Sequence, residues 1–386
     1  MSMRRPCVKR VHNPVHFPGG RILIGSGQYG VGAEILDESG HIWHAIQLMD
    51  GSREYEAVIR DLQAGLGGLD AGSAREIVEK LCESGYIEDA DAGIAGVLSL
   101  RELERYSRNE NFFGWVDTTP RDTRFCLQDR LGMAKVAVLG LGGVGSSVAA
   151  SLVCAGVGHL RCVDFDIIEL SNLNRQFLYT EDDLGAGKVE RAVKRLSRMN
   201  TDVIVEGLEQ RICSTESAAH AIDGVDFVVL CADTPYPDVQ FWVNDAAAAS
   251  SSPWSVCFYA GATMMTGIFI PAKTPCYRCY LASAPSILRD DNGTQGETLY
   301  DIAPVNAVIA PTAALAGQFS ALETIYFLAG LQPQTVGRTF HQNLMIYEHS
   351  YYLTPAASTA CAQCSHLASP GPAELTGRWP QDDLPW

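Results

Sequence analysis

The sequence lacks the features that two broad classes of protein require. No apolar run reaches the roughly 20 residues of a membrane-spanning helix, and the chain does not begin with the charged start and apolar core of a signal peptide. Lys and Arg number 29 against 45 Asp and Glu, which gives a net charge of −16. Because nucleic-acid affinity comes mainly from Lys and Arg on phosphates, this balance argues against a large nucleic-acid surface. We expect a cytoplasmic protein with neither nucleic acid nor membrane as partner.

Length and cysteine content set the next bounds. A chain of 386 residues is long for one domain and predicts two, each able to bury a core. We place the domains at residues 1–95 and 96–366, followed by a tail at 367–386 whose Pro and Asp content predicts poor order. Twelve cysteines in a reducing compartment do not predict a disulfide framework, so metal binding is the first hypothesis.

Residues 1–95 have the pattern of a small α+β unit. Turn residues separate β-like runs, and apolar residues at helical spacing follow them. The predicted elements are strands at 21–25, 29–35 and 86–88 and helices at 41–49, 53–62 and 72–82. This set is typical of a winged-helix-like module. Its helices lack a basic recognition surface, so DNA binding is disfavoured.

The stretch from Val136 to Gly145 is the centre of the second domain. Val136–Leu139 is an apolar run short enough for a buried strand, and a predicted helix at 146–155 follows a turn rich in glycine. The glycines of this turn are Gly140, Gly142, Gly143 and Gly145. Such a loop presents free backbone N–H groups and a helix N-terminus, which suit phosphate. A second strand, Leu160–Asp164, ends on an acid placed to hold a ribose hydroxyl.

The glycine loop and Asp164 alone leave NAD(P), FAD, S-adenosylmethionine and ATP open, with a dinucleotide oxidoreductase as the default. The residues that follow favour ATP. Arg175 and Lys188 offer a guanidinium fork and an ammonium, which suit β- and γ-phosphates, and Asn172 can bond phosphate or ribose. Asp233 ends a further predicted strand, 226–233, at the ligand edge of a parallel sheet, where it suits Mg2+. A helix N-cap is the plainer role for Asp233, and the two roles are compatible.

Two Cys-x-x-Cys pairs stand far apart in the sequence. Their cysteines are Cys276, Cys279, Cys361 and Cys364. Four thiolates suit tetrahedral Zn2+ and leave no open coordination position, so we interpret the site as structural. A redox role for either pair stays open, although neither pair is predicted to open a helix after a strand.

Two further segments predict contacts between subunits. A helical pattern at 100–106 ends near Arg105 and Arg108, which most often form a solvated face. The alternative for these arginines is a phosphate ligand donated across a subunit boundary. A long helix rich in small residues is predicted at 303–331, which suits close packing or a dimer interface.

In combination these motifs resemble the ThiF/MoeB superfamily, relatives of the ubiquitin-activating enzyme. The resemblance covers about residues 100–365 and implies a Rossmann-like, doubly wound, mostly parallel sheet that adenylates a carboxylate with MgATP. It implies ATP and Mg2+ as cofactors and Zn2+ as a structural ion. By position it assigns the cofactor site to Gly140, Gly142, Gly143, Gly145, Asp164, Asp166, Asn172, Arg175, Gln176 and Lys188. It also assigns Mg2+ to Asp233 and places Arg108 in the ATP site of a second copy, which predicts a homodimer.

The first 95 residues resemble the PQQ-type peptide chaperone fold, which captures leader peptides as an added strand. With this unit, the chain is similar to the branch of the family that modifies ribosomal peptides, of the microcin C type. We predict adenylation of a precursor-peptide carboxylate, followed by condensation, dehydration or nucleotide transfer. The alternatives are a sulfur-carrier adenylyltransferase and a binding protein with a vestigial nucleotide fold. The resemblance implies a cysteine in the loop after the first cysteine pair for those members that form a thioester. Residues 282–303 contain no cysteine, so a thioester step is not expected.

Overall fold

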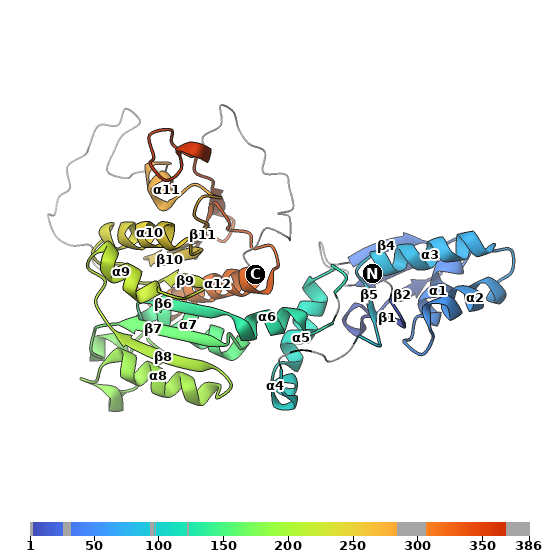
Figure 1. Ribbon diagram of the computed structural model, residues 1–386, viewed down its shortest axis with the longest axis horizontal. Helices are drawn as coiled ribbons and strands as arrows, with labels where there is room; N and C mark the ends of the chain where they lie inside the picture. Colours follow the sequence, from blue (N-terminus) through green and yellow to red (C-terminus); the bar gives the residue numbers. More distant parts are fainter. Residues whose placement is uncertain are drawn as a thin grey trace. The chain divides into compact units, whose positions relative to one another are not determined.

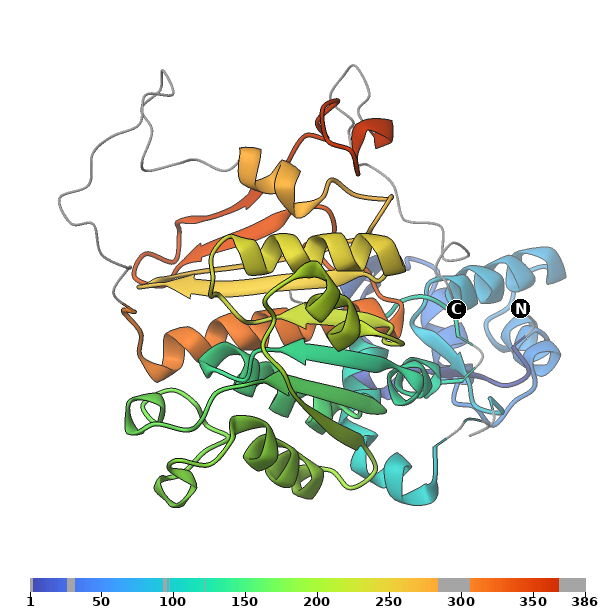
Figure 2. The same ribbon diagram turned by 60° about the vertical axis from the view of Figure 1, so that its left-hand side comes forward.

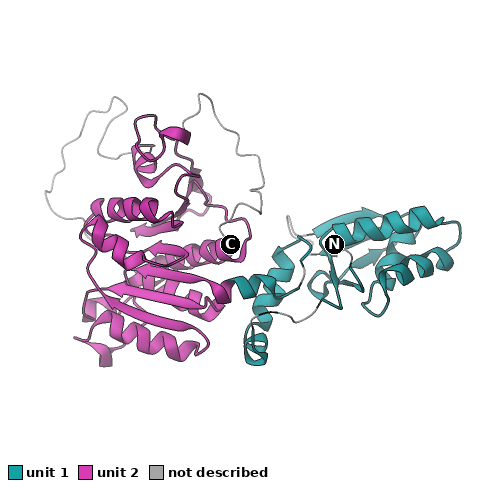
Figure 3. Ribbon diagram, viewed as in Figure 1, with its two compact units in different colours: residues 1–130 teal, residues 131–386 magenta. Residues whose placement is uncertain are grey.

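The computed structural model describes residues 3–25, 32–92, 96, 98–121, 123–283 and 306–367. The chain divides into two compact units, residues 1–130 and 131–386 (Figure 3). The functional boundary at residues 95/96 remains a prediction, as does the tail, which from residue 368 lies outside the described residues. No helix among the described residues is long and apolar enough to cross a membrane.

The first unit contains two small antiparallel sheets and a set of short helices. The strands of the two sheets are β2 (Val15–Phe17), β3 (Arg21–Gly25) and β4 (Gly32–Leu36), in the order β2-β3-β4, and β1 (Pro6–Val8) paired with β5 (Ile87–Asp89). The helices are α1 (His41–Leu48), α2 (Tyr55–Gly65), α3 (Ala71–Glu83), α4 (Leu100–Arg105) and α5 (Ser107–Val116). The three predicted helices between 41 and 82 are therefore confirmed (Figure 1).

The core of the first unit forms because each of these helices has one apolar stripe. Val58 and Leu62 of α2 and Val78 of α3 are fully buried against Ile22 of β3. Such spacing places the side chains on one helix face, and burying that face stabilises a helix too short to persist alone. The start of α3 is set by Asp70, whose carboxylate accepts the N–H groups of two first-turn residues at 2.8 and 3.0 Å.

The helical pattern predicted at 100–106 is interrupted in the structure. Helix α4 ends at Arg105, and Arg108 lies in the first turn of α5, so the two arginines do not share one helix end as predicted. Helix α5 and the following α6 (Cys126–Met133), which crosses the boundary between the units, were not predicted. The apolar stripe of α5 is narrow: Phe113 is its buried side chain among those described.

The second unit is an α/β fold around an eight-stranded sheet in the order β13-β12-β11-β10-β9-β6-β7-β8. The parallel strands are β6 (Lys135–Leu139), β7 (His159–Asp164), β8 (Ile204–Glu209), β9 (Phe227–Leu230) and β10 (Trp254–Ala260). The antiparallel strands are β11 (Thr263–Phe269), β12 (Thr339–Asn343) and β13 (Ser350–Leu353). The predicted mostly parallel sheet is thus confirmed. From β6 the chain adds β7 and β8 on one side and then adds β9 and β10 on the other. Open sheets bind ligands at such a reversal of strand order, which here lies between β6 and β9.

Helices cover both faces of this sheet (Figure 2). They are α7 (Gly143–Ala155), α8 (Lys188–Met199), α9 (Thr215–Ile222), α10 (Asp238–Ser250), α11 (Tyr277–Ser283) and α12 (Ala310–Ala329). Successive residues of a strand point to opposite faces. On β9, Phe227 contacts Phe327 of α12 at 5.0 Å between ring centroids, whereas Val228 packs with Val243 of α10. Both faces are therefore buried, which explains why β9 is apolar at every position.

Several boundaries differ from the predicted ones. Helix α7 begins at Gly143, three residues before the predicted start, and ends at Ala155, where its C-cap Gly156 has a left-handed φ of 85°. The strand predicted at 226–233 ends at Leu230. The long helix predicted at 303–331 is seen as Ala310–Ala329, and residues 303–305 lie outside the described residues.

Candidate functional site

The glycine loop lies at the point where the order of the parallel strands reverses. Strand β6 ends at Leu139 and α7 begins at Gly143, so the loop stands above the end of β6. Strand β7 flanks β6 on one side and β9 on the other. Asp164, the last residue of β7, and Asp233, three residues after β9, therefore flank the loop. The sequence places these residues far apart, and the sheet order brings them to one edge.

The glycines of the loop serve different purposes. Gly140 has φ +95°, and a Cβ there would come within 2.7 Å of the backbone nitrogen of Ala232. A Cβ on Gly145 would overlap the carbonyl oxygen of Gly140. Packing therefore requires these two glycines. A Cβ on Gly142 would meet no described atom closer than the Gln176 side-chain nitrogen at 3.9 Å, so the space above Gly142 is open to a ligand.

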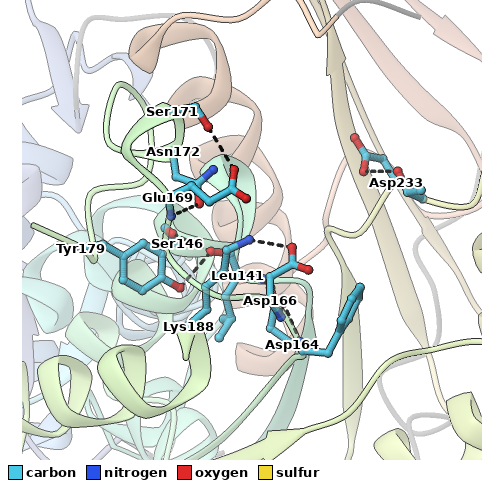
Figure 4. Close-up of polar contacts among 12 residues, drawn as sticks. Leu141, Ser146, Asp164, Asp166, Glu169, Ser171, Asn172, Tyr179, Lys188 and Asp233 are labelled. Atoms are coloured by element: carbon cyan, nitrogen blue, oxygen red, sulfur yellow. Dashed lines mark hydrogen bonds and ion pairs between the residues drawn. The ribbon is translucent and has the colours of Figure 1, made fainter. Parts of the chain in front are cut away.

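Asp164 ties the glycine loop to the end of β7 (Figure 4). One carboxylate oxygen accepts the backbone N–H of Leu141 at 2.7 Å, and the other accepts those of Phe165 and Asp166 at 2.7 and 2.9 Å. The residue is 8% exposed. A carboxylate has about four acceptor positions, so one remains for a ribose hydroxyl. Asp164 therefore shapes the loop and keeps one acceptor position free for a ligand.

Lys188 and Asp166 form an ion pair beside the loop. The Lys188 ammonium donates to a carboxylate oxygen of Asp166 at 2.8 Å, and the Lys188 backbone N–H donates to the carbonyl of Asp166 at 2.9 Å. The Lys188 side chain is 7% exposed, whereas that of Asp166 is 48% exposed. An ammonium has three N–H donors, so two remain for phosphate oxygens. The salt bridge holds the cation in place before a ligand arrives.

The segment from Asn172 to Gln176 adds polar atoms next to Gly143. Arg175 donates through one terminal nitrogen to the carbonyl of Ser171 at 3.0 Å, and its stem would lie 3.1 Å from a Cβ on Gly143. The Asn172 side-chain oxygen accepts the backbone N–H of Glu169 at 3.1 Å. Among the described residues, the buried Nε of Arg175 and Oε1 of Gln176 have no hydrogen-bond partner. The unpaired donor of Arg175 fits a phosphate oxygen, whereas the unpaired acceptor of Gln176 fits a hydroxyl or amino group of a ligand.

Asp233 lies in an exposed loop between β9 and α10. One carboxylate oxygen accepts the hydroxyl of Thr234 at 3.1 Å. The predicted N-cap role is wrong, because α10 begins at Asp238 and its N-cap is Pro237. In Figure 4 Asp233 lies apart from Asp164, Asp166 and Lys188. An exposed carboxylate with free acceptor positions on this edge suits Mg2+ coordination.

Two residues of the site were not predicted. The hydroxyls of Tyr179 and Ser146 both donate to the carbonyl of Leu141, each at 3.1 Å. Burial raises the pKa of Tyr179, so its hydroxyl stays protonated and remains a donor. These bonds anchor the glycine loop from behind. The sequence carries no signal for them, because many Ser and Tyr residues could reach a backbone carbonyl and only the fold selects these two.

The four predicted zinc cysteines meet at one point. The sulfur atoms of Cys276, Cys279, Cys361 and Cys364 all lie within 4.8 Å of one another. Zn–S bonds of about 2.3 Å place neighbouring sulfurs about 3.8 Å apart, so this donor set fits tetrahedral Zn2+. The expectation that neither pair opens a helix is wrong, because α11 begins one residue after Cys276. The convergence of all four thiols still favours the metal over two separate redox pairs.

Arg108 belongs to the first unit. It is exposed in the first turn of α5, and a terminal nitrogen lies 3.5 Å from the hydroxyl of its neighbour Ser107. Its assignment to the ATP site of a second copy remains a prediction.

Comparison with known proteins supplies the family. The sulfur carrier protein ThiS adenylyltransferase of Bacillus subtilis is 32% identical over 238 residues, which cover 61% of this chain and 64% of that protein. The chain spans about half to two thirds of the length of the curated relatives it matches. Among solved structures, two crystal structures of E. coli MccB are similar to this chain. The structure with ATP gives a TM-score of 0.73 and the structure with MccA gives 0.75. In both, the identity is 22%, and the similarity covers 93% of this chain and 99% of that chain. At that identity the likeness shows the fold alone.

The family model described as "ThiF family" matches residues 106–365. This range holds the glycine loop, the cations that follow it and all four clustered cysteines. The chain belongs to the ThiF family.

Proposed function

We propose that the protein activates a carboxylate of a ribosomally made precursor peptide as an acyl-adenylate, using MgATP. The observation that carries this proposal is the open space above Gly142, next to Gly143, against which the stem of Arg175 lies. The buried Nε of Arg175 has no hydrogen-bond partner among the described residues. The buried ammonium of Lys188 belongs to the same site. Membership of the ThiF family and a curated relative named as an adenylyltransferase support ATP as the ligand.

The chemistry follows from charge and position. A peptide carboxylate is ionised at neutral pH, so it attacks the α-phosphorus without a general base, and pyrophosphate leaves. Arg175 and Lys188 would bind the β- and γ-phosphates and offset the negative charge that develops on the leaving group. Asp164 would hold the ribose. Asp233 would hold Mg2+, which supplies further charge neutralisation. Catalysis is then mainly orientation of two bound anions.

The acyl-adenylate opens two outcomes. A nearby amide or other nucleophile of the same peptide can attack the activated carbonyl, with loss of AMP, which gives condensation or dehydration. A nucleotide-transfer product would instead keep the AMP group. Both begin with the same adenylation step, so the residues described above serve either outcome.

The first unit is proposed to capture the leader of the precursor. Its sheet β2-β3-β4 leaves the outer edges of β2 and β4 without a strand partner among the described residues. An open edge can pair with an extended peptide through backbone hydrogen bonds. The three-helix and three-strand composition supports a winged-helix-like module of this kind. E. coli MccB, similar in fold over 93% of the chain, was crystallised with MccA.

We expect the β4 edge to bind the leader, because β4 has five residues against three in β2 and ends in the exposed Leu36. Leu36→Ala should raise the Kd of a fluorescent precursor peptide about fivefold to tenfold, which corresponds to roughly 1 to 1.5 kcal/mol of lost apolar burial. The matched control is Val15→Ala on the other edge, which should leave the Kd unchanged. Fluorescence anisotropy gives both values. An effect confined to Val15→Ala would assign the leader to β2 and contradict this expectation.

A homodimer is part of the proposal. Helix α12 carries Leu315, Phe319 and Leu322, which are 40%, 38% and 39% exposed and recur at a spacing of four and three residues. This spacing places them on one helix face. An apolar stripe of this kind suits a second copy, and Arg108 would then complete the ATP site of that copy.

The function is tested by ATP–pyrophosphate exchange. We expect exchange that depends on a precursor peptide, and a short reading frame next to the gene is where the sequence of that peptide should be sought. Mass spectrometry after incubation with MgATP should show loss of water or gain of the AMP group. A peptide that is bound but neither supports exchange nor changes mass would contradict the proposal.

One alternative has its own support. The curated relatives include two adenylyltransferases of sulfur carrier proteins, at 32% and 38% identity. If this chain were one of them, exchange would depend on a folded carrier protein with an exposed C-terminal carboxylate and would not need the leader. Running the same exchange assay with the peptide and with such a carrier protein separates the two functions.

A further inference from the structure

Helix α10 contacts both cysteine turns through one buried amide. The side-chain oxygen of Asn244 accepts the backbone N–H of Tyr277 at 3.0 Å, and its side-chain nitrogen donates to the side-chain oxygen of Gln363 at 2.7 Å. Tyr277 directly follows Cys276, and Gln363 directly precedes Cys364. Asn244 is 2% exposed, and its bond to Tyr277 is buried, whereas its bond to Gln363 is partly buried. A single side chain thus joins two turns that lie 85 residues apart.

The next residue of α10 reinforces this bridge. Asp245 accepts the Gln363 side-chain N–H at 2.9 Å through one oxygen and a terminal N–H of Arg278 at 2.7 Å through the other. Arg278 directly precedes Cys279, and its guanidinium lies 4.2 Å from the ring centroid of Phe241 on the same helix. The residues between the cysteines of both turns are therefore bonded to two consecutive positions of α10.

The chemistry of asparagine suits this position. An amide accepts and donates at the same time, which neither a carboxylate nor an apolar side chain of similar size can do. Without a metal no bond joins the two turns through the four sulfurs, so other contacts have to hold the turns together. Direct contacts between the cysteines of the two turns include the backbone N–H of Cys276, 3.1 Å from the sulfur of Cys364, and the sulfurs of Cys276 and Cys361, 3.6 Å apart.

We propose that Asn244 is a positioning residue for the zinc site, whose amide holds the two Cys-x-x-Cys turns at the separation that Zn2+ requires and so slows release of the metal. The proposal rests on zinc occupancy of the four cysteines. The proposal gives α10 the role of orienting the cysteine ligands. No motif in the sequence links this helix to the cysteines. Residues that orient metal ligands in this way typically change metal affinity by 10- to 100-fold when they are replaced.

The test is the rate of zinc release from the full-length protein into a chromogenic chelator. Asn244→Leu should release zinc at least about tenfold faster than the unmodified protein. Asn244→Asp keeps an acceptor for the Tyr277 N–H and loses the donor to Gln363, so its rate should be intermediate. The matched control is Asn200→Leu. Asn200 is also fully buried and both donates and accepts, to Val153 at 2.8 Å and from Asp202 at 3.1 Å, outside the cysteine turns.

The outcomes separate the possible failures. Equal release rates for Asn244→Leu and Asn200→Leu would overturn the positioning role, because general destabilisation would then account for both. If Asn244→Leu does not fold, Gln363→Leu removes the same bridge from the second turn and should also release zinc faster, and an unchanged rate overturns the proposal. Absence of zinc from the unmodified protein would instead reject the metal site itself, and adenylation activity would be unaffected by that result.

Discussion

Replacing Lys188 with alanine should lower peptide-dependent ATP–pyrophosphate exchange at least about 100-fold, which corresponds to roughly 2.7 kcal/mol of lost transition-state stabilisation. Lys188 is the first residue of α8, and its ammonium is held at 2.8 Å from Asp166 with two N–H donors remaining. Its loss removes a buried cation from the place where we propose pyrophosphate departs. Binding of the peptide should change little, since the proposed leader site lies in the first unit. Arg175→Ala and Asp233→Ala should act in the same direction.

Two controls make this result specific. Lys194→Ala removes an exposed lysine from the same helix and should leave exchange unchanged. Lys188→Ala also leaves Asp166 without its ion-pair partner, so the double variant with Asp166→Asn separates lost catalysis from lost stability. We expect the double variant to melt like the unmodified protein and still fail in exchange. Near-normal exchange in Lys188→Ala would contradict the proposal that Lys188 binds the triphosphate.

The second large effect is expected at the cysteine cluster. The unmodified protein should contain about one zinc per chain, and the double variant Cys276→Ser/Cys361→Ser should contain almost none, by atomic absorption. Binding free energy of a structural zinc is folding free energy, so the variant should also melt roughly 10 °C lower. One serine replaces a ligand in each turn, which leaves too few thiolates for a tetrahedral site.

The control for this experiment uses two exposed cysteines. Cys154 and Cys213 lie outside the cluster, and Cys154→Ser/Cys213→Ser should keep both the zinc and the melting temperature. A redox function predicts a different pattern, with no zinc in the unmodified protein and a disulfide within each pair. The opening of α11 by the first pair makes this comparison necessary, because redox pairs are often found at helix starts.

The elements that could be predicted are those with a strong local period. Helix α1 was predicted at 41–49 and is observed at His41–Leu48, because its apolar residues recur at helical spacing. The central strands β6 and β9 were predicted because the runs Val136–Leu139 and Phe227–Leu230 are buried on both faces and wholly apolar. By contrast, β12 and β13 were missed, since polar and aromatic residues dominate them and they pair at the outer edge of the sheet.

The candidate site divides in the same way. The glycine loop, the acid that ends β7 and the two cysteine pairs were recognisable because their spacing along the chain is part of their chemistry. Three residues could not be recognised in the sequence: Tyr179, Ser146 and Asn244. Tyr179 and Asn244 bond to groups far away along the chain. Ser146 bonds to a backbone carbonyl inside the glycine loop, and no sequence pattern marks such a bond. The predicted N-cap role of Asp233 failed because a loop of unpredicted length separates it from α10.

The amino-acid sequence by itself determined the class of fold, the position of the glycine loop and the identity of the four clustered cysteines, because periodicity and short spacings act within a few residues. Only the tertiary structure decided which glycine leaves room for a ligand, which acid pairs with Lys188 and which amide joins the two cysteine turns. Those contacts depend on the strand order of the sheet and on the packing of α10 beside α11. Such packing comes from burial of apolar surface across the whole unit. Because the hydrophobic effect is non-directional, it does not fix which distant residues meet, and so it leaves no local pattern in the sequence.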